Sequence, residues 1–216
     1  MANKKVRREK SENVEQMILN VAEDIFLEKG YAMTSTTEIA KRVGCNQALI
    51  HYYFRTKERL FEKLFEKKFV IFISAVVLSK ERSANFRDVV RGIIESHAEI
   101  ISQNPRLPFL LINEMTTNPV RFRVIAEKIK ETVGSLLSGI DTELKKEIAA
   151  GRVREISAFD LFLNILSLNL FVYIAQPLIS HVRDYSFEEF VKFTKKRNEE
   201  VFLTVWGGIC IKENIL

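Results

Sequence analysis

Apolar side chains recur at helical spacing near the start of the chain. Four of them are separated by four, three and four positions, which places them on one face of an α-helix: Val14, Ile18, Val21 and Ile25. Gly30 follows, and glycine there can adopt the left-handed conformation that commonly ends a helix. The pattern therefore predicts a first helix that ends near residue 30.

Two short helices are predicted next. Ser35 and Glu38 have the spacing of a capping box, which begins a helix, and Gly44 is placed to end it. A third helix is expected from residue 46 or 47 to Phe54. Ala40 and Gly44 are small where two helices are expected to cross closely. A longer helix followed by two short ones joined at a tight turn predicts a helix-turn-helix.

The rest of the chain is helical in pattern as well. Thr56 is placed to cap a fourth helix that continues through the apolar segment 69–78. Ser157, and the pair Ser186 and Glu189, are placed to cap the last two helices, and Pro177 is expected to kink the first of these. Further helices are expected over residues 85–102, 109–115, 120–150, 157–183 and 187–211.

These patterns predict an all-α chain of about nine helices with no convincing strand. The scarcity of glycine (8) and proline (4) in 216 residues also favours long helices over many short strands. We expect an N-terminal arm and three-helix helix-turn-helix domain over residues 1–56. A larger helical domain is expected over residues 57–216.

Charge is concentrated in the first third of the chain. Residues 1–68 hold 14 Lys or Arg and 10 Asp or Glu, a net of +4 out of +5 for the whole chain. A local basic excess is expected of a nucleic-acid contact, although a solvated basic tail has the same composition. Cys45 and Cys210 lack metal-ligand spacing, and no apolar run reaches the roughly 20 residues of a membrane span. We therefore expect a cytoplasmic protein without a membrane segment.

Four motifs follow one another in the first third of the chain. They are Gly30-Tyr31, the segment Thr34-Ser35-Thr36-Thr37-Glu38-Ile39-Ala40, Val43-Gly44, and the segment from Ile50 to Phe61 that reads IHYYFRTKERLF. Their order and spacing resemble the DNA-binding domain of TetR-family repressors, over roughly the first quarter of the chain. The resemblance implies an all-α homodimer that binds double-stranded DNA and has a variable C-terminal domain, residues 57–216, for ligand binding and dimerisation.

The resemblance also implies which side chains face DNA. Hydroxyls at the start of the second helix can meet phosphate, and the Gln47 amide can bond adenine in the major groove, although an exposed helix-start residue is the alternative. Lys57 lies where the helix dipole disfavours a cation, so a phosphate contact is expected of it. At His51 the family usually has tyrosine. The full set is Thr36, Thr37, Gln47, Ala48, His51, Tyr52 and Lys57, with Tyr53 assigned to packing.

Aromatic and polar residues in the second half suggest a ligand pocket, although residues at such spacing are also typical of ordinary core. A mostly apolar small molecule would fit this lining. The three histidines lie on different predicted helices, and neither a phosphate-binding glycine loop nor a Ser/His/Asp arrangement is present, so no enzyme, cofactor or metal is expected. The candidate lining residues are Phe69, Phe72, Val76, His97, Phe109, Asn113 and Phe122.

The last two long helices carry more apolar surface than one partner helix covers. Pairing with a second copy would give a four-helix interface, with Phe202 or Trp206 at or near the seam. The sequence therefore predicts a homodimeric, ligand-responsive repressor that binds a palindromic operator and is released by a mostly apolar small molecule. The alternatives are a helical protein-interaction module without DNA binding, and a constitutive or protein-controlled repressor.

Overall fold

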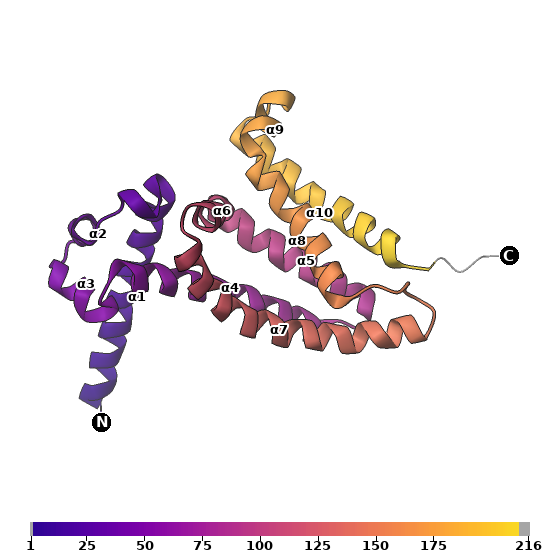
Figure 1. Cartoon of the computed structure of the whole chain (residues 1–216), viewed down its shortest axis with the longest axis horizontal. Helices are drawn as coiled ribbons and strands as arrows, with labels where there is room; N and C mark the ends of the chain where they lie inside the picture. The colour runs from indigo at the N-terminus through magenta and orange to yellow at the C-terminus, as the bar shows by residue number, and fades with distance from the viewer. Residues whose placement is uncertain (1, 212–216) are drawn as a thin grey trace. The chain divides into compact units, whose positions relative to one another are not determined.

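The protein is built from α-helices (Figure 1). The computed structural model describes residues 2–211, with side chains except at residues 2–12, 69, 72, 73, 75, 78–82, 111, 121, 125, 128, 129 and 132. This range holds ten helices, which confirms the predicted all-α fold. They are α1 (Ala2–Met33), α2 (Thr36–Val43), α3 (Gln47–Phe54), α4 (Lys57–Arg82), α5 (Phe86–Gln103), α6 (Leu107–Thr117), α7 (Pro119–Ala149), α8 (Ala158–Ile174), α9 (Gln176–Arg183) and α10 (Phe187–Ile209).

The predicted helix starts are confirmed in their capping contacts. The Ser157 hydroxyl accepts from the Asp160 backbone N–H (2.9 Å), and Ser186 forms a full capping box with Glu189. Ser35 accepts from the Glu38 backbone N–H (3.2 Å), whereas the Glu38 carboxylate pairs with a lysine of α1 instead of returning to Ser35. Of the two reciprocal bonds of a capping box, the one that the Ser35 hydroxyl accepts is therefore present.

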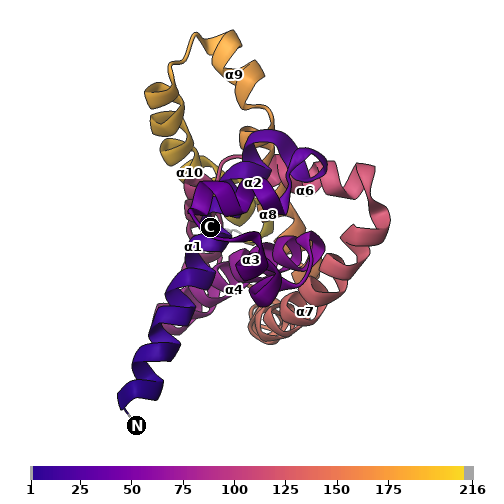
Figure 2. The ribbon, with the colours of Figure 1, turned by 90° about the vertical axis from the view of Figure 1, so that its left-hand side faces the viewer.

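The predicted helix over 157–183 is two helices. It breaks at Ala175, and α8 and α9 are bent by 63° at this break. Pro177 lies in the first turn of α9, where its missing N–H costs nothing, so the chain restarts there rather than merely kinking. Figure 2 shows α9 leaving the direction of α8 before the chain returns through α10. Within residues 2–211 the β-type pairing is one isolated bridge between Val153 and Cys210.

None of the described helices is by itself long and apolar enough to cross a membrane. The bent pair α8 and α9 reaches the required length and composition when its two helices are taken together.

Two compact units divide the chain. The first comprises residues up to 68 together with 110–126, and the second comprises residues 69–109 and those from 127 onward. The first part of α4 therefore belongs to the helix-turn-helix unit and the remainder to the other unit. The boundary that the sequence suggests between residues 56 and 57 stays a prediction.

Four aromatic rings form the centre of the first unit. Phe61 packs edge-on against Phe26 (4.9 Å between ring centroids), Tyr31 (4.9 Å) and Phe65 (4.8 Å). All four side chains are buried. Edge-to-face contacts between buried rings add stability beyond the area that they bury. This cluster joins the end of α1 to the start of α4.

Helices α5, α8 and α10 pack together as the centre of the second unit (Figure 1). Val90 and Ile94 of α5, Ile165 of α8 and Phe202 of α10 are fully or almost fully buried in one core with residues of α7. The Arg91 guanidinium lies 3.8 Å from the centroid of the Phe202 ring and covers one side of it. This arrangement fixes the direction of α10 against α5.

Candidate nucleic-acid interface

Helices α2 and α3 have one buried face and one exposed face. Ile39 and Ala40 of α2 and Ile50 and Phe54 of α3 are buried. A Cβ built on Gly44 would meet nothing within 4 Å, so the expectation of a close helix crossing at this glycine is wrong. Gly44 is instead required by its left-handed backbone (φ 77°), which ends α2 and begins the turn.

The exposed face of α3 carries most of the predicted DNA contacts. Ala48 and His51 are exposed, and the Tyr52 side chain exposes 69% of its surface, whereas Tyr53 is half-buried. The His51 Nδ1 donates to the Arg55 carbonyl oxygen (2.8 Å) in the tautomer that fits this contact, which leaves Nε2 as its other polar atom. These residues are placed where a groove of DNA could reach them, and their contacts with DNA stay predictions.

Two ion pairs hold α2 against α1. The Arg42 guanidinium donates to both carboxylate oxygens of Glu28 (2.8 and 2.9 Å). Lys29 pairs with Glu38 (2.5 Å). Exposed ion pairs contribute little stability singly, but a bidentate Arg–carboxylate pair fixes orientation. The start of α2 is therefore held in place from the side of α1.

Gln47, at the first position of α3, bonds to the first two residues of α2. Its Nε2 donates to the Thr36 hydroxyl oxygen (3.0 Å), and the Thr37 hydroxyl donates to its Oε1 (3.2 Å). The structure therefore brings three of the predicted DNA-facing residues into contact. Spacing along the sequence did not suggest this contact, because Thr36 and Gln47 lie eleven positions apart in different helices.

Lys57 reaches back to the end of the first helix. Its ammonium donates to the carbonyl oxygens of Tyr31 (3.0 Å) and Thr34 (2.8 Å) and lies 4.1 Å from the centroid of the Tyr31 ring. The Tyr31 hydroxyl donates to the Glu58 carboxylate, which lowers the pKa of Glu58. Lys57 therefore fastens α4 to the α1–α2 segment, a role that sequence reasoning missed. The phosphate contact expected of it stays a prediction.

The predicted pocket residues are spread over both units. Val76 and His97 are buried in the second unit, where Phe109 is exposed, whereas Asn113 and Phe122 belong to the first. The side chains of Phe69 and Phe72 lie outside the described ones. The pocket formed by these seven residues stays a prediction.

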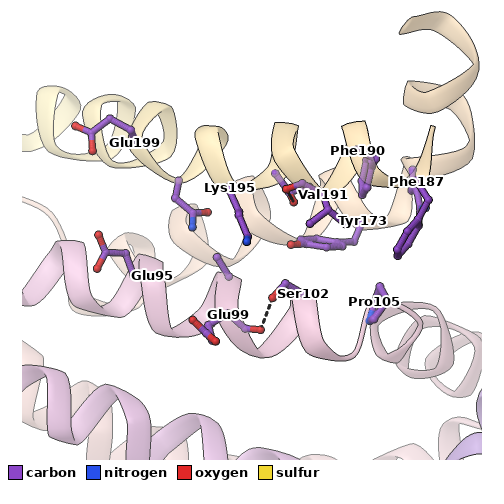
Figure 3. A pocket seen from close by; sticks show the side chains of 14 residues that line it. Glu95, Glu99, Ser102, Pro105, Tyr173, Phe187, Phe190, Val191, Lys195 and Glu199 are labelled. Atoms are coloured by element: carbon purple, nitrogen blue, oxygen red, sulfur yellow. Dashed lines mark hydrogen bonds between the residues drawn. The ribbon is translucent and has the colours of Figure 1, made fainter. Parts of the chain in front are cut away.

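A groove of about 670 Å³ lies within the second unit, between α5 and α10, with Tyr173 of α8 beside it. Figure 3 shows Glu95 and Glu199 at one end of this groove and Phe187, Phe190 and Pro105 at the other. Arg91 donates to Glu199 (2.5 and 3.2 Å), which lowers the pKa of Glu199. The groove thus has one charged end and one aromatic end, and the predicted pocket includes none of its lining residues.

The residues suggested for the dimer seam pack inside one chain. Phe202 is fully buried, and Trp206 is half-buried and stacked on it (6.4 Å). Phe202 therefore offers no surface to a second chain in this arrangement. A set of exposed apolar side chains lies on α8, where Phe159, Leu163 and Phe171 expose 58%, 47% and 65% of their surfaces at spacings of four and eight residues. This stripe follows one side of α8.

Comparison with known proteins places the helix-turn-helix in a family. Residues 18–64 match the family model described as bacterial regulatory proteins, tetR family. The chain is similar to the fatty acid metabolism regulator protein of Bacillus subtilis (strain 168), with 25% identity over 64% of this chain and 70% of that protein. It is also similar to the nucleoid occlusion factor SlmA of Vibrio cholerae, with 24% identity over 84% of this chain and 87% of that protein.

A solved structure shares the fold over most of the length. The transcriptional regulator FadR of Bacillus subtilis, in complex with stearoyl-CoA, superposes with a TM-score of 0.70. It has 20% sequence identity and covers 90% of this chain and 98% of its own. The similarity therefore extends through both units and is not confined to the helix-turn-helix.

Proposed function

We propose that the chain, whose residues 18–64 match the model of the TetR family of bacterial regulatory proteins, is a ligand-responsive DNA-binding repressor of that family. It binds a palindromic operator as a homodimer and is released by a mostly apolar small molecule. The observation that carries the DNA-binding part is the exposed face of α3, with Tyr52 and His51 outward and Ile50 and Phe54 buried. A helix buried on one side and polar on the other can enter a major groove without losing its packing.

The geometry of DNA supports the homodimer. Two recognition helices must lie about 34–36 Å apart, or a multiple of that, to read successive major grooves on one side of the duplex. One chain supplies one such helix, α3. The exposed stripe of Phe159, Leu163 and Phe171 gives a second copy an apolar surface to cover. A two-fold dimer makes the preferred operator a palindrome.

Gln47→Ala tests DNA reading. The variant is expected to lose roughly 1–3 kcal/mol of binding free energy on the duplex that the wild-type protein selects from a random-sequence pool, and much less on random duplexes. The reason is that the amide of Gln47 bonds base edges, whereas the remaining contacts go to phosphate. Fluorescence anisotropy at fixed salt measures both affinities. Failure of the wild-type protein to bind any duplex would reject the proposed function, and equal losses would make Gln47 a positioning residue.

Lys57→Met is the comparison variant in the same assay. It keeps the hydrophobic stem but removes the donors to the Tyr31 and Thr34 carbonyls. Affinity is expected to fall alike on selected and random duplexes. The dependence of affinity on salt separates its two roles, because a lost phosphate contact lowers the slope by about 0.9. A slope equal to that of the wild-type protein would leave Lys57 with the fastening role alone.

The effector part of the proposal has two supports. The FadR structure that shares this fold holds stearoyl-CoA, a molecule with a long apolar chain. The groove between α5 and α10 has a volume of about 670 Å³ and an aromatic end, which suits a small molecule of that kind. The predicted pocket is the other place where an effector would bind. Binding changes DNA affinity only if the effector prefers one arrangement of the protein.

Stearoyl-CoA is therefore the first probe of release. It is expected to raise the midpoint of DNA binding, because an apolar ligand that prefers the released state lowers the population able to bind the operator. Anisotropy titrations of the protein–operator complex measure the shift, with butyryl-CoA as the control that shares the head group. An unchanged midpoint with stearoyl-CoA and with a wider set of apolar molecules would leave a constitutive or protein-controlled repressor.

A further inference from the structure

We propose that Thr36 and Thr37 set the base preference of the recognition helix by holding the Gln47 amide in the orientation that reads adenine. This role replaces the phosphate contacts that the family resemblance implies for the two hydroxyls. The proposal rests on the proposed function, because it requires Gln47 to face a base in the protein–DNA complex. Beyond the proposed function, it identifies two side chains that do not touch the base and yet decide which base Gln47 binds.

The geometry is a bridge across the turn. Thr36 and Thr37 are the first two residues of α2, and Gln47 is the first residue of α3. The Gln47 Nε2 donates to Thr36 Oγ1 at 3.0 Å in a partly buried contact, and Thr37 Oγ1 donates to Gln47 Oε1 at 3.2 Å in an exposed one. Both ends of the amide are thus fixed by the protein. Its plane cannot turn without breaking at least one of these bonds.

Counting donors and acceptors shows that the held amide can still read a base. A glutamine amide has two N–H donors and an oxygen with two lone pairs. The bonds to Thr36 and Thr37 use one donor and one lone pair. One donor and one lone pair remain. Adenine offers an acceptor at N7 and a donor at N6 in the major groove, so a remaining amide group can meet it with a hydrogen bond.

Holding the amide also removes a cost of binding. Glutamine is among the side chains that lose the most rotamer freedom when they are ordered. A Gln47 already fixed by two hydroxyls loses less of this freedom on contact with DNA, and pre-organised contacts bind more tightly. The α2 helix that carries both threonines is itself held against α1, near its start by the Lys29–Glu38 pair and near its end by the Arg42–Glu28 pair. The two threonines therefore hold the Gln47 amide from a helix that is itself fixed in place.

The test is a double-mutant cycle between the protein and one atom of the DNA. Thr36→Val and Thr37→Val keep the side-chain shape and remove the hydroxyl. The duplex is the one that the wild-type protein selects from a random-sequence pool, and each of its adenines is replaced in turn by 7-deazaadenine, which lacks the N7 acceptor. Tyr52→Phe removes a different hydroxyl of the same interface and is the matched control. Thermal unfolding of each variant confirms that it is folded.

Thr36→Val is expected to weaken binding to the adenine duplex about tenfold, the value of one hydrogen bond. Thr37→Val is expected to have a smaller effect, about threefold, because water can replace an exposed bond. On the 7-deazaadenine duplex that Gln47 senses, both variants are expected to bind within about twofold of the wild-type protein. Tyr52→Phe is expected to weaken both duplexes equally, as a phosphate contact does.

Three outcomes would overturn the proposal. Equal losses on both duplexes would return the threonines to phosphate contact or to a purely structural role. Tighter binding by the valine variants would mean that the bonds compete with DNA and must open. A wild-type protein that binds its selected duplex but ignores every N7 replacement would leave Gln47 without an adenine to read. Absence of DNA binding altogether is a different result, because it rejects the proposed function itself.

Discussion

Leu163→Glu is expected to convert the proposed dimer into monomers. Leu163 lies between Phe159 and Phe171 on the exposed apolar stripe of α8, and it exposes 47% of its surface within one chain. A two-fold interface would bury the new carboxylate twice, once from each copy. Removing an unpaired charge from water costs several kcal/mol, so the dimer dissociation constant is expected to rise at least about a hundredfold. Analytical ultracentrifugation over a range of concentrations measures it.

Val77→Glu is the matched control for this variant. Val77 exposes 41% of its surface and lies on α4, a different helix from the one that carries the stripe. The control variant is expected to keep the wild-type dissociation constant. The Leu163→Glu monomer is also expected to bind one half-site and to lose the added affinity for a palindrome. An unchanged dimer in a folded Leu163→Glu protein would contradict the position that we propose for the seam.

Local signals in the sequence were sufficient for most of the helix boundaries. Ser35, Ser157 and Ser186 begin helices because a cap satisfies backbone N–H groups only two or three residues away. Gly44 ends α2 because its own backbone adopts a left-handed conformation. Such features depend on a few neighbouring residues, so a single sequence contains the information. The break at Ala175 was foreseen only as a kink at Pro177, because the position of a break also depends on packing.

The side chains of the candidate site were identified by type, but their partners were not. Lys57 contacts the carbonyl of Tyr31, 26 positions away, and Gln47 contacts Thr36 across the turn. These distances along the chain close only when three helices have packed. Periodicity likewise placed Phe202 on the apolar side of α10 without indicating whether that side faces its own core or a second chain. Tertiary contacts decide which partner each side chain meets and whether an apolar face is turned to its own core, and the pattern of one sequence does not reveal these contacts.

Acid is expected to destabilise the second unit through His97. The imidazole is buried between α5 and α8, and burial lowers its pKa from 6.5 to about 4. Asn169 Nδ2 donates to the Ile94 carbonyl (3.1 Å) and lies 3.3 Å from His97 Nδ1. With Asn169 as the donor, Nδ1 accepts and the imidazole is neutral. Protonation would place a positive charge in the core and turn this acceptor into a second donor facing the amide group.

The sign of the effect follows from proton linkage. Between pH 6.5 and pH 4 the unfolded chain binds a proton at His97 that the folded chain does not, so acid favours unfolding. The contribution of the neutral His97 to the free energy of unfolding is therefore fully present above pH 6.5 and is lost as the pH falls towards 4. A shift from 6.5 to about 4 corresponds to a loss of about 3 kcal/mol. Roughly 2 kcal/mol of this is expected to be lost by pH 5.

Urea unfolding at fixed protein concentration, from pH 7 to pH 4, measures this loss. Carboxylates that titrate in the same range, such as Glu58 and Glu199, whose pKa values are lowered, also reduce stability in acid. His97→Gln therefore supplies the reference, because a glutamine oxygen can accept from Asn169 and does not titrate. The stability difference between the wild-type protein and the variant is expected to shrink by about 3 kcal/mol across this range. The same dependence of the free energy of unfolding on pH in the wild-type protein and in His97→Gln would show that the imidazole is not held neutral by burial. An NMR titration that gives His97 its ordinary pKa would show the same.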